Sequence, residues 1–119
     1  MSNRAFYSII QYCPDRFRAE TVNVGLILFQ NHEGTLVKYK VDRKRIREFL
    51  GTSEPEFDQM IIALDGIMSI ADQIESQDEL EDLARTRAND IRLTKPRLVK
   101  IGDDMISEME RLFLELVEA

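Results

Sequence analysis

The sequence predicts an α+β domain, in which a mostly antiparallel sheet of three or four strands has helices packed on one face. Two observations support this prediction. Strand-like segments with a period of two occupy the first third of the chain, and segments with a 3.6-residue period dominate the rest. A chain of 119 residues has the length of one domain, so we expect residues 1–119 to share one core without a metal or a disulfide.

Three strands are expected near the N-terminus. Residues 5–13 are rich in aromatic and β-branched types and end at Pro14, and residues 35–41 follow a compact turn. Residues 21–29 are apolar on both faces, which is typical of a central strand. Strict alternation in this strand predicts one face with Asn23, Gly25, Ile27 and Phe29 and another with Val22, Val24, Leu26 and Leu28.

Helices and one further strand are expected after residue 41. Asp42, Ser53 and Ser76 are typical N-caps, and Ser53 with Glu56 forms a capping box. Gly66 inside the second helix costs about 1 kcal/mol against Ala, so we expect it to allow a close packing contact. Residues 91–94 read as an edge strand before Pro96. The last helix, capped by Asp103 or Asp104, is expected to point these residues inward: Ile106, Met109, Leu112, Phe113, Leu116 and Val117.

The single Cys and the single His leave little catalytic or metal chemistry. They exclude a disulfide within the chain and a zinc site of the usual ligand kinds. Cys13 and His32 lie at opposite ends of the expected hairpin, roughly 30 Å apart at ~3.4 Å per strand residue, which is too far for a Cys–His dyad. We therefore expect a buried Cys13, a solvated His32, and neither a metal nor a cofactor.

Hydropathy and charge indicate the cellular compartment of the chain and the kind of partner that it suits. It has neither a secretory leader pattern nor a run of the ~18 apolar residues that a membrane helix needs, so we expect a cytoplasmic protein without membrane contact. The net charge of −6 is unevenly distributed: residues 1–47 are basic, whereas residues 48–83 carry eleven acidic side chains and no Lys or Arg. Such polarity suits docking to a protein partner better than indiscriminate nucleic-acid binding.

A polar constellation around the central strand is the main candidate for binding. Gly25 lacks a side chain and so lets another backbone or a ligand come close, and the Asn23 amide beside it can form hydrogen bonds with that backbone or ligand. The alternative is structural: Asn23 satisfies backbone groups of the 14–20 loop, and Glu20 pairs with Arg18. The candidate residues are Arg16, Arg18, Glu20, Asn23 and Gly25.

Two charged patches are further candidates. A basic patch has the composition of an anion or nucleic-acid footprint, although the net negative charge favours its explanation as a solvated strand edge and helix face. It consists of Lys38, Lys40, Arg43, Lys44, Arg45 and Arg47. An acidic patch, Asp78, Glu79 and Asp82, is typical of a solvated helix start, where carboxylates favour the helix dipole; a cation site is the less favoured alternative.

Several segments resemble a bacterial family of proteins of unknown function, the family numbered 3037. The similarity lies in residues 7–12, in residues 14–15 and 18–28 with their Arg-x-Glu-x-x-Asn-Val-Gly run, in residues 91–97 and in residues 112–117. Family members commonly have Gly where this chain has Ala19. The resemblance implies no established activity. It does imply a possible setting, because members are encoded beside HipA-like kinases, as antitoxin-like subunits would be.

Two functions remain open from the sequence. The first is a non-catalytic accessory or regulatory subunit that binds an intracellular enzyme, such as a HipA-like kinase, through the acidic helices and residues 16–25. The alternative is a nucleic-acid- or nucleotide-binding module that uses the basic patch. Enzymatic activity is not expected, because it would need carboxylates and arginines around Asn23 to act on a bound substrate. A homo-oligomer is compatible with either function.

Overall fold

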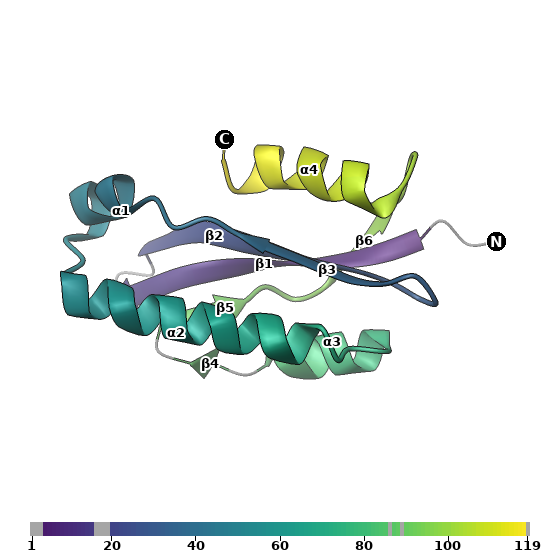
Figure 1. Ribbon diagram of the computed structural model, residues 1–119, viewed down its shortest axis with the longest axis horizontal. Coiled ribbons are helices and arrows are strands. Elements are labelled where there is room, and N and C mark those ends of the chain that lie inside the picture. Colours follow the sequence, from purple (N-terminus) through teal and green to yellow (C-terminus); the bar gives the residue numbers. More distant parts are fainter. Residues whose placement is uncertain (1–3, 16–19, 86, 89, 119) are drawn as a thin grey trace.

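A computed structural model describes residues 4–15, 20–85, 87–88 and 90–118. Within them, six strands and four helices follow one another along the chain (Figure 1). The strands are β1 (Arg4–Asp15), β2 (Glu20–Gln30), β3 (Gly34–Tyr39), β4 (Arg87–Ala88), β5 (Ile91–Leu93) and β6 (Arg97–Lys100). The helices are α1 (Arg43–Leu50), α2 (Glu54–Ala71), α3 (Gln77–Ala84) and α4 (Met105–Leu116).

The strands form one antiparallel sheet in the order β3-β2-β1-β5-β4, and β6 also pairs with β1. Strands β5 and β6 share the same edge of β1: Leu93 lies opposite Ile10, and Arg97 lies opposite Tyr7. The path from 93 to 97 is one residue longer than that from 7 to 10, so the chain bulges near Pro96, which has no N–H to donate. The α+β class is confirmed, and the sheet has more strands than the three or four predicted.

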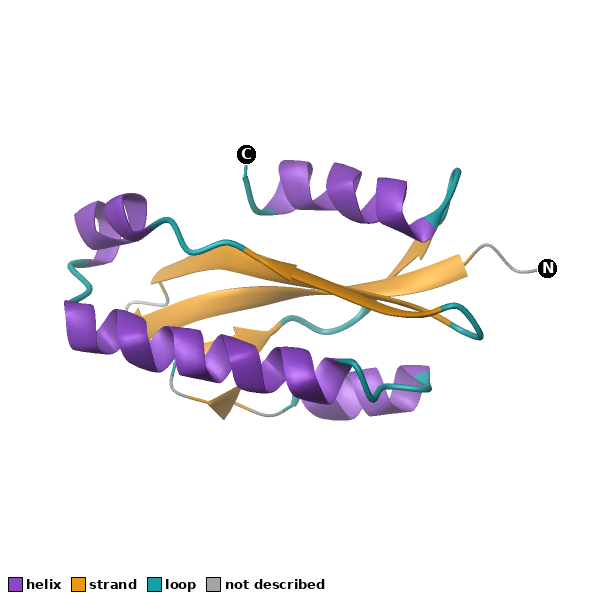
Figure 2. Cartoon of the chain, viewed as in Figure 1, coloured by secondary structure: helices purple, strands orange, loops and turns teal. Residues whose placement is uncertain are grey.

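Helices cover both faces of this sheet, which corrects the prediction that they pack on one. In Figure 2, α2 and α3 lie on one side of the strands and α4 lies on the other. The larger core joins Ile27 and Phe29 of β2 to Phe57 and Leu64 of α2. The smaller core joins Leu26 and Leu28 of β2 to Leu112 and Phe113 of α4. The unbroken apolar run from Leu26 to Phe29 in β2 is what this double cover requires.

A β-bulge in β2 changes which side chains share a face. Ile10 lies opposite Gly25 and Gln11 lies opposite Asn23, so Val24 has no partner of its own on β1. The alternation shifts by one residue there. Val22 and Val24 consequently pack in the α2-side core with Ile27 and Phe29, rather than with Leu26 and Leu28 as strict alternation predicted.

The predicted helix ends are confirmed. The Asp42 side chain accepts a hydrogen bond from the Arg45 N–H, Gly51 adopts a left-handed φ of 69°, and the Ser53–Glu56 capping box forms at α2. Asp104, one of the two candidates, caps α4.

Two predictions about helix faces are wrong. Ile106 was expected inward but is 65% exposed. Outside its own stretch of helix, no atom of the described residues lies within 4 Å of where a Gly66 Cβ would stand, so Gly66 makes no close packing contact with them.

Candidate functional site

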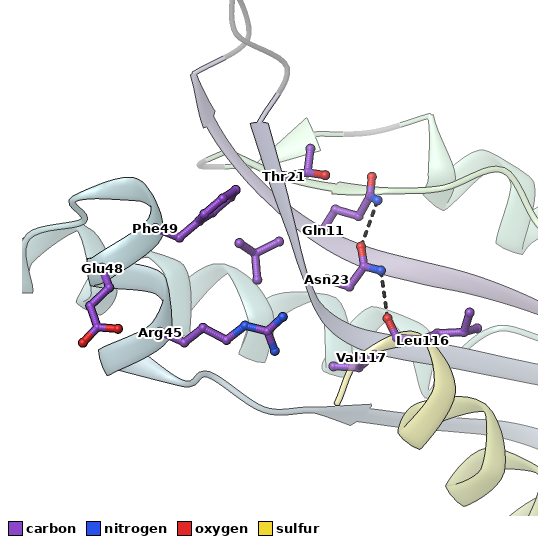
Figure 3. A pocket seen from close by; sticks show the side chains of 9 residues that line it. Gln11, Thr21, Asn23, Arg45, Glu48, Phe49, Leu116 and Val117 are labelled. Carbon is purple, nitrogen blue, oxygen red and sulfur yellow. Dashed lines mark hydrogen bonds between the residues drawn. The ribbon is translucent and has the colours of Figure 1, made fainter. Parts of the chain in front are cut away.

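An open groove of about 690 Å³ lies between α1, the strands β1 and β2, and the C-terminal end of α4 (Figure 3). Its lining combines polar and apolar side chains: Gln11, Thr21, Val22, Asn23, Arg45, Glu48, Phe49, Leu116 and Val117. A smaller hollow of about 130 Å³ shares Asn23 and Arg45 with it and extends toward Lys40. We call these two connected hollows the Asn23 groove.

The floor of the Asn23 groove is a chain of hydrogen bonds that crosses three strands and reaches α4. Arg92 Nε donates to Gln11 Oε1 at 3.1 Å, and Gln11 Nε2 donates to Asn23 Oδ1 at 3.0 Å. Asn23 Nδ2 then donates to the carbonyl oxygen of Leu116 at 2.8 Å. Both polar atoms of the Asn23 amide therefore serve the fold, and the backbone group it satisfies belongs to α4 rather than to the 14–20 loop.

Gly25 serves the packing of the sheet rather than the groove. A Cβ on it would stand 2.8 Å from the Lys38 carbonyl oxygen and 2.9 Å from Ile10 Cδ1 and Tyr39 Cβ. The neighbouring strand and the core fill this space. Of the two alternatives predicted for Gly25, it is therefore another backbone, and not a ligand, that comes close to it. Because those neighbours border the α2-side core, Gly25 and Asn23 face opposite sides of the sheet, which corrects the prediction of a shared face.

Helix α1 supplies the rim of the groove. The Arg45 side chain reaches toward β2, and the Phe49 ring lies apart from it, on the side of the groove nearer Thr21 (Figure 3). Helix α1 is eight residues long, and its buried residue is Ile46. Phe49, on the same helix, is 60% exposed. The Arg45 guanidinium makes no ion pair with the described residues, so it is the cation in the groove that remains available to bind an anion.

The other described residues of the predicted constellation, Glu20 and Gly25, do not line this groove. Arg16 and Arg18 lie outside the described residues. Glu20 begins β2 opposite Asp15, is partly exposed and is not among the side chains that line the groove. Of the three predicted residues that the structure describes, Asn23 is the one that lines it.

The basic patch is divided among separate neighbours. Arg43 and Arg47 both pair with Glu54 and lie over the Phe57 ring, with centroid distances of 5.5 and 5.7 Å. The remaining members point elsewhere. Lys38 Nζ stands 4.6 Å from the Phe113 ring centroid, Lys40 pairs with Glu118 at 3.9 Å, Lys44 is exposed on α1, and Arg45 turns to the groove.

The acidic patch is exposed around the start of α3. The Glu79 side chain accepts a hydrogen bond from the Glu75 N–H at 3.1 Å, and Asp82 pairs with Arg85 at 3.5 Å. Cys13 is buried and His32 is exposed in the β2–β3 turn, as the sequence predicted.

The side chains that line the groove offer both apolar surface and charged or polar groups to a ligand. Among the described residues its lining holds the Gln11 and Asn23 amides, a hydroxyl, one guanidinium, one ammonium, three carboxylates and an aromatic ring, but no thiol or imidazole. Burial raises the pKa of Tyr12, and a hydrogen bond to Asp65 raises that of Tyr39, but neither side chain lines the groove. Sequence reasoning missed Gln11, Phe49 and Leu116, because nothing in a linear pattern brings α1 and the end of α4 to the same strands.

Comparison with known proteins identifies the family. A family model described as "Protein of unknown function (DUF3037)" matches residues 7–117, which include every residue that lines the larger hollow of the groove. Neither the curated proteins nor the solved structures that were searched contain a match to this chain. Within the described part of the chain, the helices fall short of the length and apolarity needed to cross a membrane. The match over nearly the whole length shows that the chain belongs to the DUF3037 family.

Proposed function

We propose that this protein is a non-catalytic accessory subunit that binds and regulates an enzyme through the Asn23 groove. The observation that supports this proposal best is Phe49, which is 60% exposed at the rim of the groove that Arg45 also lines. Aromatic side chains and arginine are enriched at protein interfaces, where a few of them carry most of the binding energy. An exposed phenyl ring also costs free energy in water, which a partner would recover by covering it.

The groove suits a segment of a partner protein. Val22, Val117 and the Phe49 ring offer an apolar surface for one side chain, while Arg45 offers a charge for a carboxylate two or three residues away. The groove is open along one side, whereas pockets for small molecules bury most of the ligand surface. We propose an extended acidic–apolar segment of the partner as its occupant, and a HipA-like kinase as the partner that the family resemblance implies.

The divided basic patch supports a protein partner over a nucleic acid. Arg43, Arg47 and Lys40 already pair with carboxylates of the same chain, and the net charge of the protein is −6. Nucleic-acid binding needs several free cations on one surface, since affinity rises with the number of phosphates neutralised.

The test is calorimetric titration of the purified protein into the HipA-like kinase of the same genome. Phe49→Ala is expected to weaken binding at least about tenfold, and Arg45→Gln is expected to weaken it by a similar factor. Ile106→Ala is the matched control, because Ile106 is 65% exposed on α4, away from the groove, and its removal should leave the affinity unchanged.

Regulation is measured in the same samples as kinase autophosphorylation with and without the protein. Wild-type protein should change the rate, and Phe49→Ala should lose that effect at concentrations where Ile106→Ala keeps it. A kinase that binds the wild type and Phe49→Ala equally well would remove the groove from the interface. A kinase that binds neither would overturn the choice of partner.

A further inference from the structure

The outer face of α2 carries an apolar strip that the described part of the chain leaves exposed. Ile62 is 68% exposed and Ile70 is 53% exposed, and Gly66 lies midway between them, four residues from each. Residues four apart follow one another along the same side of a helix. Single exposed apolar residues are common on protein surfaces, but this strip aligns two isoleucines over two turns with a notch between them.

The notch at Gly66 has no use inside the chain. Glycine is the least favourable ordinary residue in a helix interior, yet a Cβ at this position would meet nothing within 4 Å. At Gly25, by contrast, the missing side chain admits the Lys38 carbonyl. A surface glycine between two large side chains lets the backbone of a second helix come close while the isoleucines pack on either side of it.

An acidic ridge runs beside this strip. Asp58, Asp65 and Asp72 are seven residues apart, which places them on the same flank of the helix, two turns from one another. Asp65 accepts a hydrogen bond from the Tyr39 hydroxyl at 2.9 Å, whereas Asp58 and Asp72 have no ion-pair partner among the described residues. No Lys or Arg occurs anywhere between residues 48 and 83, so the ridge has no cation of its own.

We propose that this face of α2 binds a basic amphipathic helix of a partner protein. The apolar side of that helix would cover Ile62 and Ile70 and lie across Gly66, and its Lys or Arg side chains would pair with the aspartates of the ridge. Charge decides against a second copy of this chain as the occupant. Two α2 helices packed face to face would bring two acidic blocks together without a compensating base.

The face is separate from the Asn23 groove, which is lined by α1, β1, β2 and α4, so its occupant does not depend on the function proposed for the groove. Figure 2 shows α2 on the outside of the sheet, on the side opposite α4. A partner helix laid along it would approach from the side of the domain that faces away from the C-terminal helix.

The experiment uses synthetic peptides of about 18 residues, the length of α2, in fluorescence-anisotropy titrations of the full chain. The first peptide is a lysine-rich helix with a leucine stripe. The second has the same composition in scrambled order, and the third has the leucine stripe with glutamate in place of lysine. We expect the first to bind at least about tenfold more tightly than either control, with an affinity that falls as salt is raised.

Two variants of the protein locate the site. Ile62→Ser/Ile70→Ser and Gly66→Leu should each lose at least about tenfold of this affinity. Gly66→Leu should also raise the melting temperature, because leucine is a better helix former and finds open space, so lost binding cannot be ascribed to unfolding. Ile106→Ala, an exposed isoleucine on α4, is the control that should bind normally.

Equal binding of the leucine-striped and the scrambled lysine peptides would overturn the proposal, because it would reduce the interaction to charge alone. Unchanged affinity in both α2 variants would overturn it as well. A dimer in light scattering that Ile62→Ser/Ile70→Ser converts to a monomer would assign the face to a second copy of the chain instead.

Discussion

The Asn23 side chain donates a hydrogen bond to the main-chain carbonyl of Leu116, 93 positions further along the chain, at an N–O distance of 2.8 Å. The bond joins the central part of the sheet to the last turn of α4, where helix carbonyls have no partner within the helix. It therefore closes one end of the smaller core and sets the wall of the Asn23 groove.

Asn23→Ala should lower the free energy of unfolding by about 1–3 kcal/mol, since it leaves Gln11 and the Leu116 carbonyl without their partner. Asn23→Asp isolates the second bond: the carboxylate can still accept from Gln11 but cannot donate to Leu116. Urea unfolding measures both variants. The matched control is Thr21→Val, which keeps a β-branched side chain in the same strand and should change stability by less than about 0.5 kcal/mol. Equal stability of Asn23→Asp and the wild type would show that the Leu116 bond contributes nothing.

The two glycines with opposite surroundings predict opposite effects of one added methyl group. Gly25→Ala should destabilise the protein by about 1–3 kcal/mol, because its Cβ would stand 2.8–2.9 Å from the Lys38 carbonyl, Ile10 and Tyr39. Gly66→Ala should stabilise it by up to about 1 kcal/mol, since the Cβ enters open space on a helix. Thermal unfolding of the two variants checks the pair, and a loss of stability in Gly66→Ala would mean that this glycine contributes to the isolated fold.

Ser8 is a buried polar residue on β1 whose hydroxyl has no hydrogen-bond partner among the described residues. Ser8→Ala should raise the free energy of unfolding by about 1 kcal/mol, because it removes a hydroxyl that loses its hydrogen bonds to water on folding and forms none in the folded protein. Thr94→Ala should have the opposite sign and a similar size, since Thr94 Oγ1 accepts the Ile9 N–H at 2.8 Å. Denaturant unfolding of both variants measures the two changes in the free energy of unfolding. A destabilising Ser8→Ala would contradict the prediction.

The capping box of α2 predicts a dependence of stability on pH. Hydrogen bonds from the Ser53 hydroxyl and N–H hold the pKa of Glu56 below its ordinary value of 4.5. A carboxyl whose pKa is lowered by folding stabilises the native state above its unfolded pKa and loses that contribution as pH falls through the folded pKa. Ser53→Ala should therefore cost about 1 kcal/mol at pH 7 and less on acidification below about pH 4.5.

The measurement is urea unfolding of wild type and Ser53→Ala at a series of pH values, with NMR titration of the Glu56 carboxyl carbon. In the variant, the pKa of Glu56 should rise toward its ordinary value of 4.5. A difference in stability that stays constant down to pH 3 would show that the Glu56 arm of the box carries none of the effect.

The candidate site was predictable only in part. Asn23 stood out because an amide inside an apolar strand needs a partner, and the structure shows that this partner is the Leu116 carbonyl of α4. Phe49 gave no signal, since an aromatic residue on a short helix is more often buried than exposed. The basic patch seemed continuous in the chain, but its side chains point to Glu54, Phe113, Glu118 and the groove.

What the sequence determined by itself is local. The caps at Asp42, Ser53, Ser76 and Asp104 form because each side chain reaches a backbone N–H three residues away, and the β2–β3 hairpin follows from a four-residue turn. The tertiary structure alone decided the side of the sheet for α4, the faces of β2 and the partner of Asn23. Those depend on a bulge at Val24 that places two residues opposite one, and on contacts between segments more than ninety residues apart, which no local pattern can specify.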